Sequence, residues 1–140
     1  MVYRFFAVLF TLKLFFRTII EDYIMKIRKT TESETRAILS IHSQAFGTVK
    51  GPEIAKLVSD LLGDETAFPL LSLVAVHKNK LIGHILFTKV EITGTEHPVA
   101  AQILAPLAIL PEEQTRGVGQ KLIHEGLRLL KESGTEVVFV

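Results

Sequence analysis

The chain has 140 residues, enough for one domain but too few for two domains that each bury a core. Sixteen Lys and Arg against fifteen Asp and Glu leave a net charge of +1, which provides no general attraction for a nucleic-acid backbone, so we predict no nucleic-acid partner. With 48% hydrophobic residues the chain is too apolar to be disordered, and the absence of cysteine excludes disulfides, thiol catalysis, iron–sulfur clusters and thiolate zinc sites.

Residues 1–24 form an apolar head that differs in composition from the rest. The head holds five of the nine phenylalanines, namely Phe5, Phe6, Phe10, Phe15 and Phe16. Arg4, Lys13 and Arg17 interrupt it, which argues against a membrane-spanning helix, and no small-x-small cleavage site follows, which argues against export. Three interpretations stay open, in this order: a stretch translated upstream of a start at Met25, a helix packed on the fold, and a membrane-surface anchor.

Residues 25–140 are expected to form one folded domain that begins with a short alternating strand. A capping box at Thr31 and Glu34, followed by apolar residues at helical spacing, predicts a helix over 32–45. A second amphipathic pattern predicts a helix over 52–63, joined to the first by a short mobile link.

The next segments read as strands. Residues 71–77 and 81–92 are rich in β-formers and enclose a turn, so they predict a hairpin. Residues 99–110 are almost continuously apolar, as in a strand buried on both faces. Pro106 cannot donate a ladder hydrogen bond, and its presence there predicts a bulge or a splay.

The last part of the chain predicts a helix followed by a strand. Apolar residues from Gly117 onwards mark one helical face until Gly134, and residues 136–140 are β-rich. The strand–helix–strand order predicts that the last strand runs parallel to the buried one. The whole pattern indicates a mixed α/β (α+β) fold.

The junction between the buried strand and this helix is the most informative motif, Gln114-Thr115-Arg116-Gly117-Val118-Gly119-Gln120. The first N–H groups of a helix lack intrahelical acceptors and carry partial positive charge, so they bind anions. Glycines let a phosphate approach the backbone closely, and Arg116 adds a mobile positive charge. The alternative interpretation is that both glycines only permit a tight turn.

The pattern Gln114-x-x-Gly117-x-Gly119, opening a helix after a buried strand, resembles the signature of the GNAT superfamily of acetyl-CoA-dependent N-acetyltransferases. Residues 104–126 are similar to small bacterial members, and the order of elements over 25–140 is that of the family. The resemblance implies a GNAT-like, mostly antiparallel sheet with a bulged central strand flanked by helices.

The resemblance also implies a site. The N–H groups from Thr115 to Gln120 would cradle the coenzyme A pyrophosphate, and the backbone of the buried strand would pair with pantetheine. The implied coenzyme-binding residues are Leu107, Ala108, Ile109, Gln114, Thr115, Arg116, Gly117, Val118, Gly119 and Gln120. The cosubstrate would be acetyl-CoA, and the enzyme would be cytoplasmic.

The implied reaction is direct attack by a primary amine of a small molecule or a protein N-terminus on the thioester, in a ternary complex. An amine attack needs a base, for which the sequence offers only His84 and Glu91 as candidates, and each could equally be structural or on the surface. The histidines lack metal-ligand spacing, so we predict no metal.

The sequence departs from the family pattern at its end. Members continue past Val140 with a helix, which often carries a tyrosine that protonates the thiol, and with closing strands, whereas the tyrosines here are Tyr3 and Tyr23. We therefore expect an incomplete acetyltransferase domain with weakened coenzyme binding and an open edge strand able to pair with a second copy. A non-catalytic module for coenzyme A or phosphate, an inactive fragment, and a membrane-surface protein are the alternatives.

Overall fold

The body of the protein is built on one five-stranded sheet. The structure is a computed structural model that describes residues 2–140, without the side chains of residues 2–7, 18 and 21–23. The strands lie in the order β1 (Lys26–Lys29), β2 (Leu71–His77), β3 (Lys80–Val90), β4 (Ala101–Ile109) and β5 (Val137–Phe139). Neighbours are antiparallel except β4 and β5, which are parallel. The predicted fold class, the hairpin and the parallel crossover are thereby confirmed.

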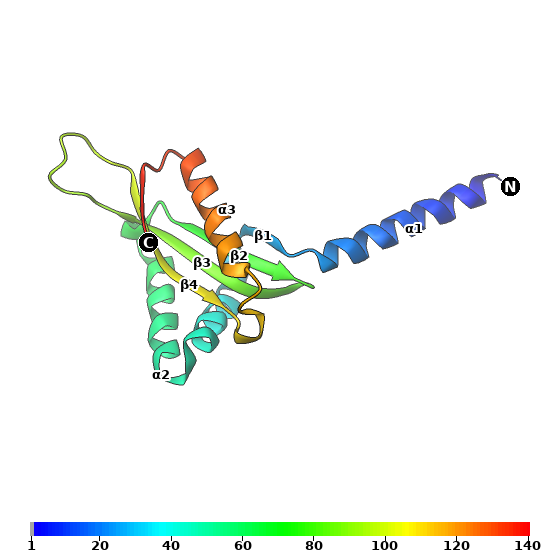
Figure 1. Cartoon of the computed structure of the whole chain (residues 1–140), viewed down its shortest axis with the longest axis horizontal. Coiled ribbons are helices and arrows are strands. Elements are labelled where there is room, and N and C mark those ends of the chain that lie inside the picture. The colour runs from blue at the N-terminus through cyan, green and yellow to red at the C-terminus, as the bar shows by residue number, and fades with distance from the viewer. Residues whose placement is uncertain (1) are drawn as a thin grey trace.

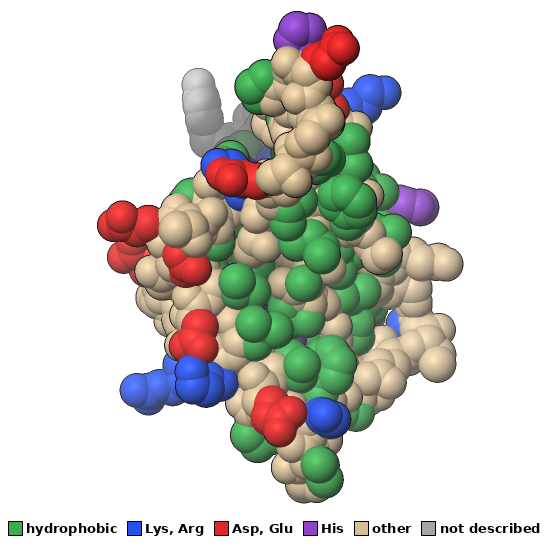
Figure 2. Space-filling view, turned by 90° about the vertical axis from the view of Figure 1, so that its left-hand side faces the viewer, with side chains coloured by type: hydrophobic (Ala, Val, Ile, Leu, Met, Phe, Trp, Pro, Cys, Tyr) green, Lys and Arg blue, Asp and Glu red, His purple; other side chains and the backbone are tan. Residues whose placement is uncertain are grey.

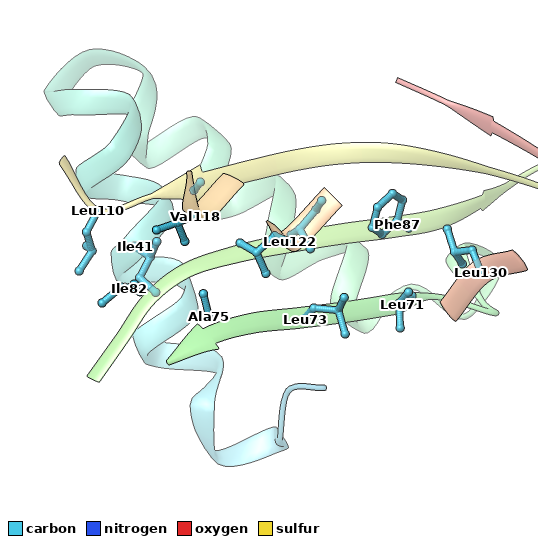
Figure 3. Packing of buried hydrophobic residues seen from close by; sticks show 12 residues of the cluster. Ile41, Leu71, Leu73, Ala75, Ile82, Phe87, Leu110, Val118, Leu122 and Leu130 are labelled. Atoms are coloured by element: carbon cyan, nitrogen blue, oxygen red, sulfur yellow. The ribbon is translucent and has the colours of Figure 1, made fainter. Parts of the chain in front are cut away.

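Two helices cover the two faces of this sheet, α2 (Thr35–Gly63) on one and α3 (Val118–Glu132) on the other (Figure 1). Side chains alternate along a strand, so neighbouring strand residues pack on opposite faces of the sheet. Leu71, Leu73 and Phe87 belong to one cluster with Leu122 and Leu130 of α3, and Ile41 of α2 joins the same cluster (Figure 3). On the other face, Val74 packs with Ile38 and Val58 of α2.

Helix α2 merges the two helices that the sequence predicts. The link expected over residues 46–50 is reduced to one non-helical residue, Gly47, with φ 75° and ψ −179°. A positive φ is accessible to glycine without a steric penalty, so one residue is enough to redirect the helix. The prediction of two helices is right, whereas the five-residue link is wrong because Thr48, Val49 and Lys50 are helical. Before α2, residues 32–34 form a 3₁₀ turn, and the Thr31 N–H donates to Glu34 Oε2 at 2.8 Å.

Strand β4 carries the bulge predicted at Pro106. Ile85 of β3 lies opposite Leu107, whereas Phe87 lies opposite Leu104, so β4 has one extra residue between these pairs. A proline that has no N–H to donate is accommodated at such a point because the ladder is interrupted there.

Helix α1 (Val2–Tyr23) projects from the body (Figure 1). Those of its large hydrophobic side chains that are described lie exposed, for example Phe10 and Phe15. In the described part of the chain, no helix is both long enough and apolar enough to cross a membrane. The three interpretations of the apolar head stay predictions.

Candidate functional site

The connection between β4 and α3 folds into a curved loop at one end of the sheet. A 3₁₀ turn over Pro111–Glu113 follows β4, and the chain then passes through two residues with positive φ, Thr115 (67°) and Gly117 (76°). Gly117 is the residue that caps α3, and Lys121 N–H donates to its carbonyl at 3.2 Å. Successive residues of opposite backbone handedness turn their N–H groups toward one concave side, the arrangement that binds anions in many proteins.

The N–H groups of this loop are free to bind a ligand. Within the described chain, none of the six N–H groups from Thr115 to Gln120 has a hydrogen-bond acceptor. The last three belong to the first turn of α3, where the helix dipole adds partial positive charge. The junction therefore carries a run of backbone donors without acceptors in the described residues, and its role as a cradle for pyrophosphate stays a prediction.

Five of the six residues from Thr115 to Gln120, all but Arg116, line a hollow of about 500 Å³. Its lining includes six of the predicted residues from the junction, namely Gln114, Thr115, Gly117, Val118, Gly119 and Gln120, together with Ile109 and Glu113. The Gln114 side chain does not point a free amide into it, because its Nε2 donates to the Ile109 carbonyl at 3.2 Å. We infer that Gln114 shapes the loop by tying it to the end of β4.

Arg116 is predicted to be a mobile positive charge, whereas in the structure it forms an ion pair with Glu113. Its Nη1 lies 2.9 Å from Glu113 Oε2, and Arg116 is not among the lining residues. The Glu113 carboxylate lines the hollow and offsets the guanidinium charge, so the partial positive charge there is that of the backbone N–H groups at the start of α3. The missed residue is Glu113, and its i, i+3 spacing from Arg116 was the signal for this pairing.

The strand end next to the hollow has one free edge. Strand β5 pairs with β4 only over Ala101 to Ile103, whereas β3 pairs with it as far as Ile109. The Leu110 N–H donates to the Ile82 carbonyl of β3 at 2.9 Å, so by alternation the polar groups of Ala108 also point to β3. Those of Leu107 and Ile109 point the other way. Of the three predicted strand residues, these two direct their backbone groups toward the free edge, where the Ile109 carbonyl already accepts from Gln114 Nε2.

His84 lies in the interior on the α2 face of the sheet. It is 0% exposed, its Nε2 is 2.8 Å from Ser72 Oγ, and its Nδ1 is 2.7 Å from His42 Nε2. Burial, with a smaller contribution from His42, lowers the pKa of His84 to about 3, and burial lowers that of His42 to about 4. Both rings are therefore neutral at neutral pH. The sequence reasoning missed His42 and Ser72 as partners of His84.

Glu91 lies apart from the hollow, in the segment that follows β3. It is exposed, its Oε1 is 3.2 Å from Lys89 Nζ, and it lines a different depression formed by residues 89–99. Tyr3 and Tyr23 lie outside the residues whose side chains the structure describes. No group of three or more His, Cys, Asp or Glu side chains in the described residues is arranged to hold a metal ion.

The family described as "Acetyltransferase (GNAT) domain" matches residues 26–140, almost the whole body of the chain. The chain belongs to the GNAT acetyltransferase family. The resemblance inferred from the signature and from the order of elements is thereby confirmed.

Other GNAT proteins show how much of a relative this chain spans. The "Uncharacterized N-acetyltransferase YjhQ" of Escherichia coli K12 is 43% identical over 111 residues, which are 79% of this chain and 60% of that protein. A GNAT family acetyltransferase from Brucella melitensis, solved in complex with acetyl-CoA, superposes with a TM-score of 0.71 at 32% identity over 81% of this chain and 72% of that one. E. coli YhbS, solved in complex with CoA, superposes with a TM-score of 0.71 at 29% identity, over 81% of this chain and 60% of that one. This GNAT chain thus spans 60% of the length of the curated relative that it matches.

Proposed function

We propose that this GNAT chain binds acetyl-CoA and transfers the acetyl group to a primary amine by direct attack in a ternary complex. The observation that carries the proposal is the run of six N–H groups from Thr115 to Gln120 that have no acceptor among the described residues, beside a hollow that five of these residues line. A diphosphate offers several acceptor oxygens and negative charge, which fits such a run of donors at a helix N-terminus. The acetyl-CoA and CoA in the two structural relatives support the choice of ligand.

The free edge of β4 would hold the pantetheine arm. Leu107 and Ile109 point their backbone groups away from β3, and the Ile109 carbonyl accepts from Gln114 Nε2. An amide-containing arm laid along this edge would pair with the backbone groups of Leu107 and with the Ile109 N–H, as an added strand does. Ala108 would then contribute its small side chain rather than its N–H group. An unpaired N–H beyond the bulge would polarise the thioester carbonyl and stabilise the charge that develops on its oxygen.

Most of the rate enhancement would come from positioning. A bound thioester and a bound amine held in contact react as if in one molecule, and no covalent enzyme intermediate is needed. The acceptor class is a primary amine of a small molecule or of a protein N-terminus. An aminoglycoside acetyltransferase solved in complex with sisomicin shares the fold at 23% identity, which makes sisomicin one reasonable probe. A cytoplasmic location belongs to the same proposal.

Two measurements test the proposed function. Calorimetric titration with acetyl-CoA is expected to show binding that Gly119→Glu weakens strongly. Release of the CoA thiol, followed with a chromogenic disulfide and a panel of primary amines that includes sisomicin, is expected to depend on the amine. Binding without amine-dependent release would favour the alternative, a non-catalytic coenzyme A module, and absence of binding would refute both.

Self-association through the open sheet edge is a further part of the proposal. Hydrophobic side chains gather on the side of the body away from α1 (Figure 2), and Phe139 and Val140 near the β5 edge are exposed. Exposed apolar edges pair readily with other chains. Light scattering across a concentration series is expected to show a dimer, and a monomer at every concentration would contradict it.

A further inference from the structure

A chain of three polar side chains crosses the interior on the α2 face of the sheet. Ser72 Oγ of β2 lies 2.8 Å from His84 Nε2 of β3, and His84 Nδ1 lies 2.7 Å from His42 Nε2 of α2. Both imidazoles are 0% exposed and Ser72 is 7% exposed. Because polar groups are costly to bury, a connected chain of this kind is expected to be either fully paired or used.

Every polar side-chain atom of Ser72, His84 and His42 but one is hydrogen-bonded. The His42 Nδ1 atom is buried and has no hydrogen-bond partner in the described residues. Two proton arrangements suit the two hydrogen bonds between neutral rings. In one, Ser72 donates to His84, which donates to His42, so that Nδ1 is an N–H donor. In the other, His42 donates to His84, which donates to Ser72, so that Nδ1 carries a free lone pair.

The three hydrogen-bonded side chains lie close to the proposed transfer site. His84 lies directly opposite Ala108 in the register of β3 and β4, and Ala108 lies between the two residues that face the free edge. The helix α3 and the hollow lie on the other face of the sheet, since Leu107 and Ile109 are the nearest neighbours of Gly119. An amine that meets the thioester from the α2 face would therefore arrive beside the two imidazoles.

A partly exposed aromatic side chain lies beside His42. The Phe46 ring is stacked on that of His42, with centroids 6.3 Å apart and planes 7° apart, and Phe46 is 40% exposed. Phe46 precedes Gly47, the one non-helical residue of α2. A rotation of this partly exposed ring at the kink would open His42 to an entering amine.

We propose that His42 Nδ1 accepts the proton from the acceptor nitrogen as that nitrogen bonds to the acetyl carbon, and that His84 and Ser72 hold His42 in the accepting tautomer. The proposal rests on the proposed acetyltransferase function. The amine lone pair forms the C–N bond, the N–H proton passes to Nδ1, and the C–S bond breaks when the tetrahedral adduct collapses. The thiolate then takes up a proton, which gives CoA thiol, and His42 returns to neutral. His42 is thus a catalytic residue, and His84 and Ser72 are positioning residues.

The electrostatics suit an acceptor rather than a cation. Burial keeps the pKa of both rings well below neutrality, so the lone pair is available at pH 7. The groups that face His42 are His84 from β3 and Phe46 from its own helix, and Ala108 is the β4 residue paired with His84, so none of these is charged. Such a weak base does not deprotonate a free ammonium ion efficiently. The protonated nitrogen of the tetrahedral adduct is more acidic than a free ammonium ion, so proton transfer to His42 costs less free energy at that stage.

The test compares His42→Ala with His97→Gln, a change of an exposed histidine in the loop after β3. With the amine panel and saturating acetyl-CoA, His42→Ala is expected to lower kcat by about 100-fold or more, with an unchanged KM for acetyl-CoA, whereas His97→Gln stays at the wild-type rate. Added imidazole, which fits the space left by the ring, is expected to restore turnover. Ser72→Ala is expected to lower kcat less, and Ser72→Thr to recover it.

The outcomes separate the two proposals. If both the wild type and His42→Ala release thiol in an amine-dependent way at the same rate, the role of His42 is overturned and the acetyltransferase function stands. Absence of release by the wild type with every amine would refute the function itself. Should His42→Ala fail to fold, nitrogen-15 NMR of the wild type decides: a His42 ring protonated at Nε2 and bare at Nδ1 supports the proposal, and the opposite tautomer overturns it.

Discussion

Replacing Gly119 by glutamate is expected to weaken acetyl-CoA binding strongly while leaving the fold intact or slightly more stable. A Cβ atom at this position would lie 3.5 Å from Leu107 Cδ2 and 3.9 Å from Ile109 Cγ1, which are ordinary van der Waals contacts. Gly119 lies in the first turn of α3, where replacing glycine in a helix contributes about 0.5–1 kcal/mol and a first-turn carboxylate about 0.3–1 kcal/mol. Thermal unfolding should therefore occur at an equal or higher temperature.

The same substitution acts in the opposite direction on the ligand. A carboxylate about 5 Å from a phosphate charge costs about 3 kcal/mol at an effective dielectric constant of about 20. A penalty of this size is on the order of a 100-fold increase in Kd. Gly119→Ala, which adds bulk without charge, is expected to weaken binding much less.

Calorimetric titration with acetyl-CoA and differential scanning calorimetry measure the two effects on the same samples. Thr95→Glu, on an exposed loop residue, is the control for the change in net charge. The reasoning would be refuted by a Gly119→Glu protein that binds acetyl-CoA as tightly as the wild type. It would also be refuted by one that loses binding only because it unfolds.

Three further predictions concern packing, charge and acidity. Gly126→Ala is expected to destabilise the fold by about 1–3 kcal/mol in urea unfolding, because its Cβ would clash with the Phe87 ring at Cε2, and no loss of stability would contradict this packing. Arg116→Ala is expected to weaken acetyl-CoA binding by about 1 kcal/mol or less by calorimetry, because the charge is exposed and already paired, so a 100-fold loss would disprove it. Burial lowers the pKa of His42 from 6.5 to about 4 and that of His84 to about 3, so the unfolded chain takes up protons first and stability should fall as the pH drops from 6.5 toward 4. A His42→Gln/His84→Gln protein, measured by urea unfolding, should lose less stability than the wild type over that pH interval. An identical loss would count against the two histidines as the source of the pH dependence.

The elements and the glycine-containing turn before α3 could be predicted from sequence because they depend on local signals. The Gly117 and Gly119 spacing, the apolar run of β4 and Pro106 each act through the backbone of their own segment. A proline without an N–H group must interrupt a ladder wherever the strand pairs, so the bulge follows from one residue. The extent of the link at Gly47 could not be predicted in this way, because three residues after it are helical and only the glycine bends.

The contact between the buried His42 and His84 side chains could not be predicted from the sequence. His42 and His84 are 42 positions apart, and no spacing rule connects a helix residue with a strand residue. The available signal was that His42 follows Ile38 by four positions and so falls on the buried face of the helix. A buried histidine needs a partner, which would have directed attention to His84. The Arg116 pairing was equally readable, from the i, i+3 spacing to Glu113.

The bulge at Pro106 sets which face of the sheet each part of β4 serves. A shift of one residue in register turns every following side chain to the other face. Without the extra residue, Leu107 rather than Ala108 would lie opposite His84 and would point toward α2. With it, Leu107 and Ile109 pack beside Gly119 under the first turn of α3, while the small side chain of Ala108 lies next to the buried imidazoles. One irregularity therefore joins the proposed phosphate site on one face to the proposed proton acceptor on the other.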